Sequence, residues 1–294
     1  MTKSIQQLKK QLLMEELKRQ GKAPKKRLWI FLGLIVLLTM TAAGIWYYSN
    51  QQTRLDEIFQ EGLDLRQAGK YAEAVEVFEK LHVEHPAFER LPEVLFQMAE
   101  IQDVYLGRPA DALLTYLMLE RDFPEAAEVI PAMQQIAVIY KYRLNDCSQA
   151  IAVYQKVLDH PVPQKDLLQY EVADCYFRLN HFDQARIELE SLLNNYPEST
   201  LIAEVQYRMA VTYALEGKLA EAAGAYRLVI ERWAESPYAL EAGFGLATVL
   251  EEQEKLLEAL KILEDLTGSY PKQEILERKT DQVRERIKKK KKAI

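Results

Sequence analysis

The sequence predicts an all-α protein, an α-solenoid of six helical hairpins preceded by one transmembrane helix and followed by a capping helix. Three observations predict this fold class. A long segment near the N-terminus carries no charge, a pattern of small residues returns six times at intervals of 36 to 38, and a basic segment follows the last copy. They divide the 294 residues into a basic amphipathic segment (1–27), a membrane span (28–48), six repeats (55–271) and a basic capping helix (272–294).

Charge is segregated along the chain, although the net value is only −6. Residues 1–27 carry a net +7, residues 49–271 a net −19, and residues 272–294 a net +6. Nucleic-acid binding needs clustered Lys and Arg, so the acidic middle argues against a nucleic-acid partner. Two cysteines are too few for a zinc site or a disulfide scaffold. We therefore expect neither a metal nor a cofactor.

The uncharged segment 28–48 has the length of a transmembrane helix. Its 21 residues span about 31 Å as a helix, which matches the hydrocarbon core of a bilayer. Trp29 marks one end, and Trp46 and Tyr47 mark the other, where aromatic rings anchor at the headgroups. Four of the six preceding residues are basic, so the N-terminus is expected in the cytoplasm and the repeats outside it.

Two alternatives stay open in the N-terminal region. The apolar segment could be a cleaved signal peptide, with small residues at 41–43 before Gly44 as the cleavage site. The anchor interpretation is preferred because the basic leader and the apolar run are both longer than a signal peptide needs. Residues 4–20 place Ile5, Leu8 and Leu12 on one helical face. They form either a helix on the inner leaflet or a solvated leader.

Two small residues recur in every copy of the repeat. The first small residue of each copy is Gly62, Ala99, Ala137, Ala173, Ala210 or Ala247. The second follows twelve or thirteen residues later and is Ala74, Ala112, Ala150, Ala185, Ala222 or Ala259. Between the two lies a helix breaker, which is Gly69, Gly107, Asn145, Asn180 or Gly217 in the first five copies. The sixth copy has residues 253–255 (Gln-Glu-Lys) there and no recognisable breaker.

This pattern predicts two packed helices per copy. Small residues let the two backbones approach, and a bulky residue four positions after the second one fills the space beside them. Gly or Asn supplies the left-handed residue that ends the first helix. Proline ends the second helix in five copies, whereas the fifth has Trp233 and Ala234 there and delays proline to Pro237. A single hairpin cannot bury its apolar face, so the six must stack.

These residues resemble the tetratricopeptide repeat family over about residues 55–271. The resemblance implies a right-handed solenoid that binds a protein partner through the concave face formed by its first helices. The period exceeds the family's usual one and is similar to the long repeats of bacterial envelope proteins. It implies a single-pass protein of the bacterial inner membrane, with the repeat domain in the periplasm and partners in the cell envelope.

An aromatic residue occurs three positions before the first small residue in five copies. These residues are Phe59, Phe96, Tyr170, Tyr207 and Phe244, with Gln134 as the exception. The resemblance places this position on the concave face, where the aromatic side chains could bind an extended or helical peptide. The alternative is that they pack between successive first helices and are mostly buried.

The two cysteines are expected to face each other. Cys147 begins the second helix of repeat 3, and Cys175 lies near the end of the first helix of repeat 4. These helices should be antiparallel neighbours joined by a turn at about residues 160–165, which brings the two residues opposite one another. A disulfide could then form outside the cytoplasm, and two unbridged buried thiols are the alternative.

No sequence motif indicates catalysis, since there is no phosphate-binding Gly-rich loop and no hydrolase or metalloprotease signature. The protein is therefore predicted not to be an enzyme and to need no small-molecule substrate. The favoured function is a membrane-anchored scaffold or adaptor in cell-envelope assembly. The alternative is a periplasmic chaperone-like subunit beside the secretion machinery. The Lys run at 288–292 is either a solvated tail or a site for anionic lipid or an acidic partner.

Overall fold

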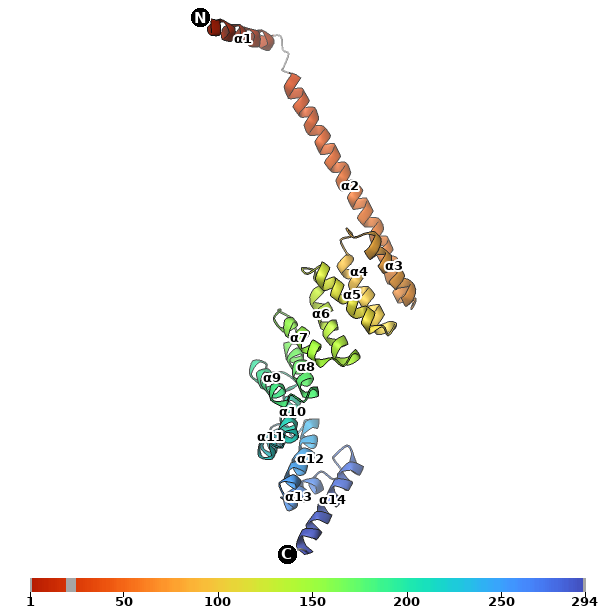
Figure 1. Ribbon diagram of the computed structural model, residues 1–294, viewed down its shortest axis with the longest axis vertical. Helices are drawn as coiled ribbons and strands as arrows, with labels where there is room; N and C mark the ends of the chain where they lie inside the picture. The colour runs from red at the N-terminus through yellow and green to blue at the C-terminus, as the bar shows by residue number, and fades with distance from the viewer. Residues whose placement is uncertain (1, 20–24, 293–294) are drawn as a thin grey trace. The chain divides into compact units, whose positions relative to one another are not determined.

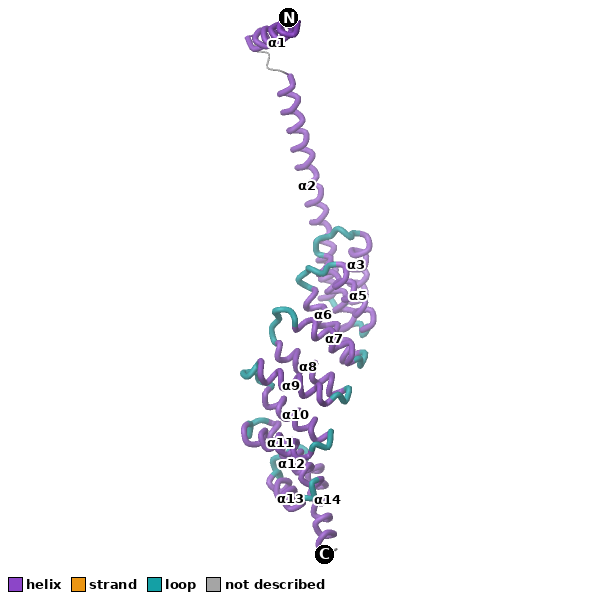
Figure 2. The backbone as a smooth tube through the Cα atoms, turned by 60° about the vertical axis from the view of Figure 1, so that its left-hand side comes forward, coloured by secondary structure: helices purple, strands orange, loops and turns teal. Residues whose placement is uncertain are grey.

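The computed structural model describes residues 2–19 and 25–292 and is helical throughout, which confirms the all-α prediction. Its contacts divide the chain into two units, residues 1–94 and residues 95–294. Figure 1 shows the helices of the second unit following one another in chain order from α5 (yellow) to α14 (blue). In Figure 2 the helices of the described part are joined by short loops, without strands.

The first unit is dominated by one long helix. α1 (Thr2–Arg19) precedes α2 (Lys25–Gln67), whose 43 residues include both the predicted span and the first helix of repeat 1. Within the described residues, the segment Trp29–Gln67 is long and apolar enough to cross a membrane. The sequence predicts the span and repeat 1 as separate parts, whereas α2 joins them without a break.

Repeat 1 forms where α2 packs against α3 (Tyr71–Glu84). Gly62 of α2 is required there, because a Cβ atom at this position would lie 2.2 Å from Cε1 of Phe78. The loop after α3 returns to α2, where the Tyr48 hydroxyl donates to Glu89 (3.2 Å) and the Gln52 amide donates to the carbonyl of Ala87 (3.2 Å). The end of the predicted span is thereby fixed to the first repeat.

The remaining helices form five hairpins and a final helix, and their bounds follow the predicted repeats. α4 begins in the first unit, and its last turns are π-helical (η1), as are those of α6 (η2). The elements are α4 (Leu91–Glu100), η1 (Ile101–Tyr105), α5 (Pro109–Asp122), α6 (Val129–Val138), η2 (Ile139–Arg143), α7 (Cys147–Leu158), α8 (Lys165–Arg178), α9 (Phe182–Asn195), α10 (Ile202–Leu215), α11 (Leu219–Arg232), α12 (Pro237–Glu252), α13 (Leu256–Asp265) and α14 (Gln273–Lys292).

The core lies between the two helices of each hairpin and, within the second unit, also between successive hairpins. Every predicted small alanine is at most 1% exposed. The bulky residues that follow the second small position are also buried, from Phe78 in repeat 1 to Leu263 in repeat 6. The predicted packing of small and bulky residues within the hairpin is therefore present in all six copies.

A left-handed residue ends the first helix in all six repeats. The five predicted breakers have φ between 53° and 74°, and Glu254 takes the same conformation in repeat 6 at 61°. Here the structure differs from the sequence analysis, which found no breaker in that copy. The helix ends there because packing of the hairpin demands a reversal, even though an L-residue adopts this conformation at a cost.

The π turns η1 and η2 explain why the interval between the small residues is twelve in some copies and thirteen in others. In repeats 2 and 3 the left-handed residue follows the first small residue by eight positions, as from Ala137 to Asn145, and by seven elsewhere, as from Ala210 to Gly217. A π turn accommodates one extra residue within a helix. The insertion is therefore absorbed before the turn, and the second helix keeps its register.

Proline is not needed to end the second helix. α11 ends at Arg232 without a nearby proline, and the N–H of Trp233 donates to the carbonyl of Val229. The same backbone bond closes the proline-ended helices α3, α5 and α9. In the fifth copy the delayed proline has another use, because Ser236 caps α12 and Pro237 is its first residue.

α14 covers the last hairpin. Leu276 and Val283 of this helix are buried against the cluster formed by α12 and α13. Its Lys279 and Arg286 pair with Glu251 of α12 at 2.5 and 2.9 Å, although Glu251 is only 2% exposed. α14 therefore provides both apolar and charged contacts to the end of the stack, as a terminal cap should.

Candidate partner-binding surface

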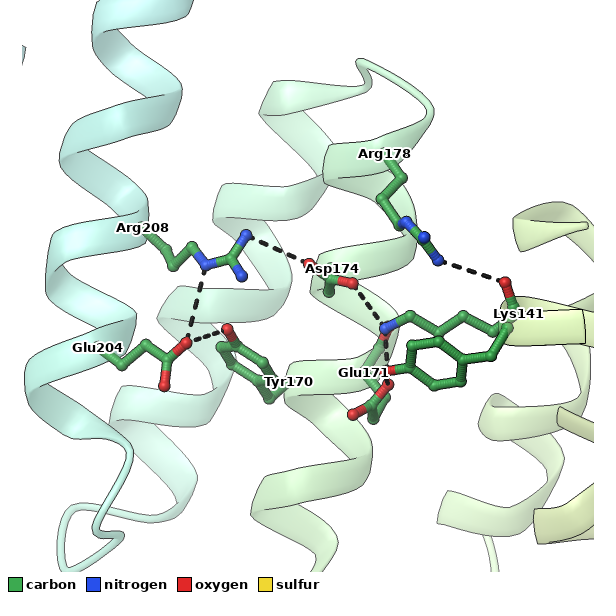
Figure 3. A network of polar contacts seen from close by, with 8 residues as sticks. Lys141, Tyr170, Glu171, Asp174, Arg178, Glu204 and Arg208 are labelled. Carbon is green, nitrogen blue, oxygen red and sulfur yellow. Dashed lines mark hydrogen bonds and ion pairs between the residues drawn. The ribbon is translucent and has the colours of Figure 1, made fainter. Parts of the chain in front are cut away.

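The first helices of repeats 3, 4 and 5 are joined by a polar network (Figure 3). Its centre is Lys141 on η2, whose side chain is fully buried. The Lys141 Nζ lies 2.6 Å from Oε2 of Glu171 and 2.7 Å from Oδ2 of Asp174, both on α8. Burial by itself would lower the pKa of Lys141, but the hydrogen bonds to Asp174 and Glu171 outweigh it and raise the pKa. The ammonium therefore stays charged inside the protein.

The network continues from α8 to α10. Nη1 of Arg208 lies 3.2 Å from Oδ1 of Asp174, and its guanidinium lies over the rings of Tyr170 and Phe177. The Tyr170 hydroxyl donates to Glu204. Burial of Tyr170 and this hydrogen bond together raise its pKa. Three successive first helices are thus tied by their side chains.

The charges of this network balance. It contains three cations and three carboxylates, namely Lys141, Arg178, Arg208, Glu171, Asp174 and Glu204. Arg178 uses its Nη1 to bind the carbonyl of Lys141 at 3.3 Å. Positive and negative groups are equal in number, so the network as a whole carries no net charge. The network therefore provides no strong electrostatic attraction for a charged partner.

The predicted aromatic residues take two different environments. Phe59 has no exposed surface and packs against Phe78, with Arg90 over its ring. The prediction that Phe59 lies on a free binding surface is therefore wrong, because the hairpin of α2 and α3 and the loop after it cover the ring. The other four are half-buried: Phe96, Tyr170, Tyr207 and Phe244.

The half-buried aromatics are partly used to hold the stack together. Phe96 meets Tyr116 edge to face at 5.6 Å, the Tyr207 ring lies 5.7 Å from that of Tyr238, and Phe244 stacks on Tyr270 at 5.1 Å. Each keeps some exposed surface. Both interpretations of the aromatic column thus have structural support, and its partner-binding role stays a prediction.

A second column of exposed side chains was not singled out from the sequence. Five positions after the first small residue, repeats 2, 3 and 5 expose Val104 (57%), Tyr142 (52%) and Leu215 (56%), and repeat 4 exposes Arg178. We call Val104, Tyr142, Arg178 and Leu215 the first-helix row. Its signal was available, because apolar residues recur at one repeat position just before the helix breaker, where solvent exposure is expected.

The remaining predicted site residues lie as follows. Trp29, Trp46 and Tyr47 project from α2 with about 70% of their surface exposed, as lipid-facing side chains would. Cys147 and Cys175 are both buried, unbridged and in one apolar cluster. In the part of the chain that the structure describes, no group of three His, Cys, Asp or Glu side chains is arranged to hold a metal ion.

Two family models described as tetratricopeptide repeat match this chain, over residues 143–209 and 204–236. No curated protein matches it. A solved tetratricopeptide repeat protein from Parabacteroides merdae ATCC 43184 is similar in fold, with 17% identity and a TM-score of 0.52 over 72% of this chain and 78% of that one. The structure of Naa15/Naa10 bound to HypK-THB matches at 15% identity and a TM-score of 0.50, over 82% of this chain and 35% of that one.

PilW, described as a widely conserved type IV pilus biogenesis factor, matches at 18% identity over 78% of this chain and 97% of PilW. Its TM-score of 0.47 is too low to carry an argument. At these identities the likenesses show the fold alone.

Proposed function

This chain belongs to the tetratricopeptide repeat family, and we propose that it is a non-catalytic, membrane-anchored scaffold that binds a protein partner in the bacterial cell envelope. The observation that carries the proposal is the first-helix row. Exposed apolar side chains that recur at one repeat position, here in repeats 2, 3 and 5, are typical of a protein-binding surface. The polar network fixes three of the first helices and includes two members of the row, Arg178 and Tyr142, whose hydroxyl donates to Glu171 (2.9 Å). The surface that the row still exposes is available to contact a partner.

The proposed topology follows from the charge pattern and from α2. Residues 1–27 are cytoplasmic, residues 28–48 span the inner membrane, and residues 55–271 with the cap 272–294 lie in the periplasm. The uninterrupted α2 supports this arrangement, because it connects the apolar segment directly to repeat 1. The partner is a protein, and neither a nucleic acid nor a small-molecule substrate is expected.

Site-specific photo-crosslinking in living cells tests the function. A photoreactive residue replaces Tyr142 or Leu215 in the first-helix row, and Ile187 on the second helix α9 serves as the control, since it is 62% exposed. We expect one or two discrete adducts from the row and none from Ile187. Equal labelling from both helices would contradict the proposed surface.

The identity of the adducts separates the remaining interpretations. A single envelope protein would support a scaffold, and loss of its adduct in a Tyr207→Ala variant would implicate the half-buried aromatics as well. Many different exported proteins would support the chaperone-like alternative. Adducts made only of cytoplasmic proteins would contradict the proposed topology.

A further inference from the structure

The two cysteines meet at the boundary between repeats 3 and 4. Cys147 is the first residue of α7, and Cys175 lies in the last turn of α8. Cys147 is 5% exposed and Cys175 is fully buried, and both belong to one apolar cluster. α7 and α8 pack directly against each other, so the two cysteines lie on facing helices within this cluster.

Their position makes a bridge structurally useful. α7 is the second helix of repeat 3 and α8 the first helix of repeat 4, so a bond between them would cross a repeat boundary. In a solenoid each repeat contacts only its neighbours, and the stack can open at any one boundary. The same boundary holds the buried Lys141 and its carboxylate partners on α8. Opening here would expose a charge cluster as well as apolar surface.

We propose that Cys147 and Cys175 form a disulfide that fixes repeat 3 to repeat 4. This inference rests on the extracytoplasmic location in the proposed function, because structural disulfides persist in oxidising compartments. The S–S bond forms by exchange with the disulfide of a thiol–disulfide oxidoreductase. That disulfide takes up the two electrons and the two thiol protons and is reduced to a dithiol.

The timing of the reaction follows from burial. Burial raises the pKa of Cys175 to about 12, so its thiol is almost entirely protonated in the folded chain and reacts slowly. Exchange therefore takes place during folding, before α7 and α8 close over the two sulfur atoms. Once formed, the bond is covered by the same apolar cluster, and reductants should reach it only when the boundary opens.

The test has two arms, both with the full-length chain. In the first, cells are quenched with acid, free thiols are blocked, and disulfides are then reduced and labelled with a maleimide polymer that shifts the chain on a gel. The second arm exposes the reduced, detergent-purified protein, unfolded and then refolded, to a glutathione redox buffer. Cys147→Ala, Cys175→Ala and the double variant are the controls, and alanine suits these buried apolar sites.

We expect two labelled thiols per wild-type chain in cells and none in the three variants. We also expect the oxidised protein to unfold at a temperature higher by about 5 °C or more than its reduced form, with no such difference in the double variant. Failure to oxidise on refolding would overturn the proposal, because the geometry would then not permit a bridge.

Ready oxidation on refolding combined with reduced thiols in cells would also overturn it. That outcome would at the same time place the repeats in the cytoplasm and so contradict the proposed topology. If the bridge forms in cells but crosslinking from the first-helix row finds no partner, the disulfide stands and the scaffold function fails.

Discussion

Repeats 3 and 6 bury opposite charges at the same position of the repeat. Lys141 and Glu251 each lie four residues after the first small alanine, and their side chains are 0% and 2% exposed. Lys141 is neutralised by carboxylates of α8, the next first helix, and Glu251 by Lys279 and Arg286 of α14. α14 therefore supplies to the last repeat the kind of contact that a following repeat supplies to repeat 3.

The comparison shows that the repeat specifies a place where a charge can be buried, whereas the next helix determines its sign. Repeat 2 follows the same rule with Asp103, which is 8% exposed and pairs with Arg143 of η2 at 3.2 Å. Repeats 4 and 5 have Phe177 and Ala214 at this position and need no counter-charge. Because a buried charge is costly without its partner, this position favours one neighbour over others.

The largest effect is expected where a buried cation is removed. Lys141→Met should destabilise the repeat domain by about 3 to 5 kcal/mol, because Glu171 and Asp174 lose their buried counter-charge. Urea unfolding of the detergent-purified chain, followed by circular dichroism, measures this loss. Lys218→Met is the matched control and should cost less than about 1 kcal/mol, since its ion pairs are exposed.

Adding Glu171→Gln and Asp174→Asn to Lys141→Met should restore most of the lost stability. Such rescue is expected because the triple variant has no unpaired charge at this boundary. If Lys141→Met behaves like the Lys218 control, or if the triple variant is no better than the single one, the buried network is not what sets the stability here.

Single-residue deletions sharpen the contrast between repeats with a π turn and those without. Val104 and Leu215 occupy the same repeat position and are almost equally exposed, but only Val104 lies in a π turn. Deleting Val104 should convert η1 to regular helix with little loss, whereas deleting Leu215 should cost about 2 kcal/mol more because it displaces packed core residues. Thermal unfolding compares the two, and equal losses would show that the π turn is not the site of the insertion.

Acid should loosen the cap that α14 forms, because it neutralises Glu251. Burial by itself would raise the pKa of Glu251, but Lys279 and Arg286 outweigh it and lower the pKa. A carboxylate with a lowered pKa stabilises the folded state above the pKa of the unfolded chain, and this stabilisation is lost as the pH falls through the folded value. Lys141 has a raised pKa because of Asp174 and Glu171, so titration of its own ammonium weakens the boundary only at strongly alkaline pH.

The check is hydrogen exchange of the α14 amides, measured at and below the pH range in which Glu side chains usually titrate. Protection of the α14 amides should fall there. In Glu251→Gln, α14 should already be less protected at neutral pH, by about 1 to 2 kcal/mol, and should respond less to acid. Equal acid sensitivity of the variant and the wild type would assign the effect to other groups.

The smallest effect concerns the left-handed residues. Glu254→Gly should stabilise the chain by about 0.5 kcal/mol, because glycine adopts this conformation without strain and the ion pairs of Glu254 are exposed. Gly217→Ala in repeat 5 should destabilise it by about 1 kcal/mol, as no atom within 4 Å of the added Cβ gives a compensating contact. Thermal unfolding of the two variants measures both changes in stability. Changes of the same sign would contradict the conclusion that Glu254 and Gly217 share a left-handed conformation.

Much of the fold could be predicted because each structural rule is repeated. Small residues at fixed spacing identified every hairpin, and five of the six left-handed turns were visible as Gly or Asn. Glu254 was missed because tertiary packing, not local preference, imposes its conformation. The π turns were visible only as a spacing of thirteen, whose physical meaning needed the backbone.

The candidate site was harder to predict, since the partners within the polar network lie at different repeat positions. Lys141, Asp174 and Arg208 lie at different offsets from their small residues, so no single column of the repeat marks them. The buried state of Phe59 depends on the loop after α3 and on Arg90, which sequence spacing does not place. The first-helix row does share one position, and it could have been found by asking which apolar positions the hairpin leaves uncovered.

In the proposed topology, the uninterrupted α2 makes the number of residues between the span and repeat 1 a mechanical variable. An α-helix turns by about 100° and rises by about 1.5 Å per residue. One alanine inserted among residues 49–51 would turn the first repeat about the helix axis by that angle, and seven would return it nearly to its original heading about 10 Å further from the bilayer. For a partner held in the same membrane, the insertions would change the orientation of repeat 1 and its distance from the bilayer separately. A graded series of insertions could tell which of the two the partner requires.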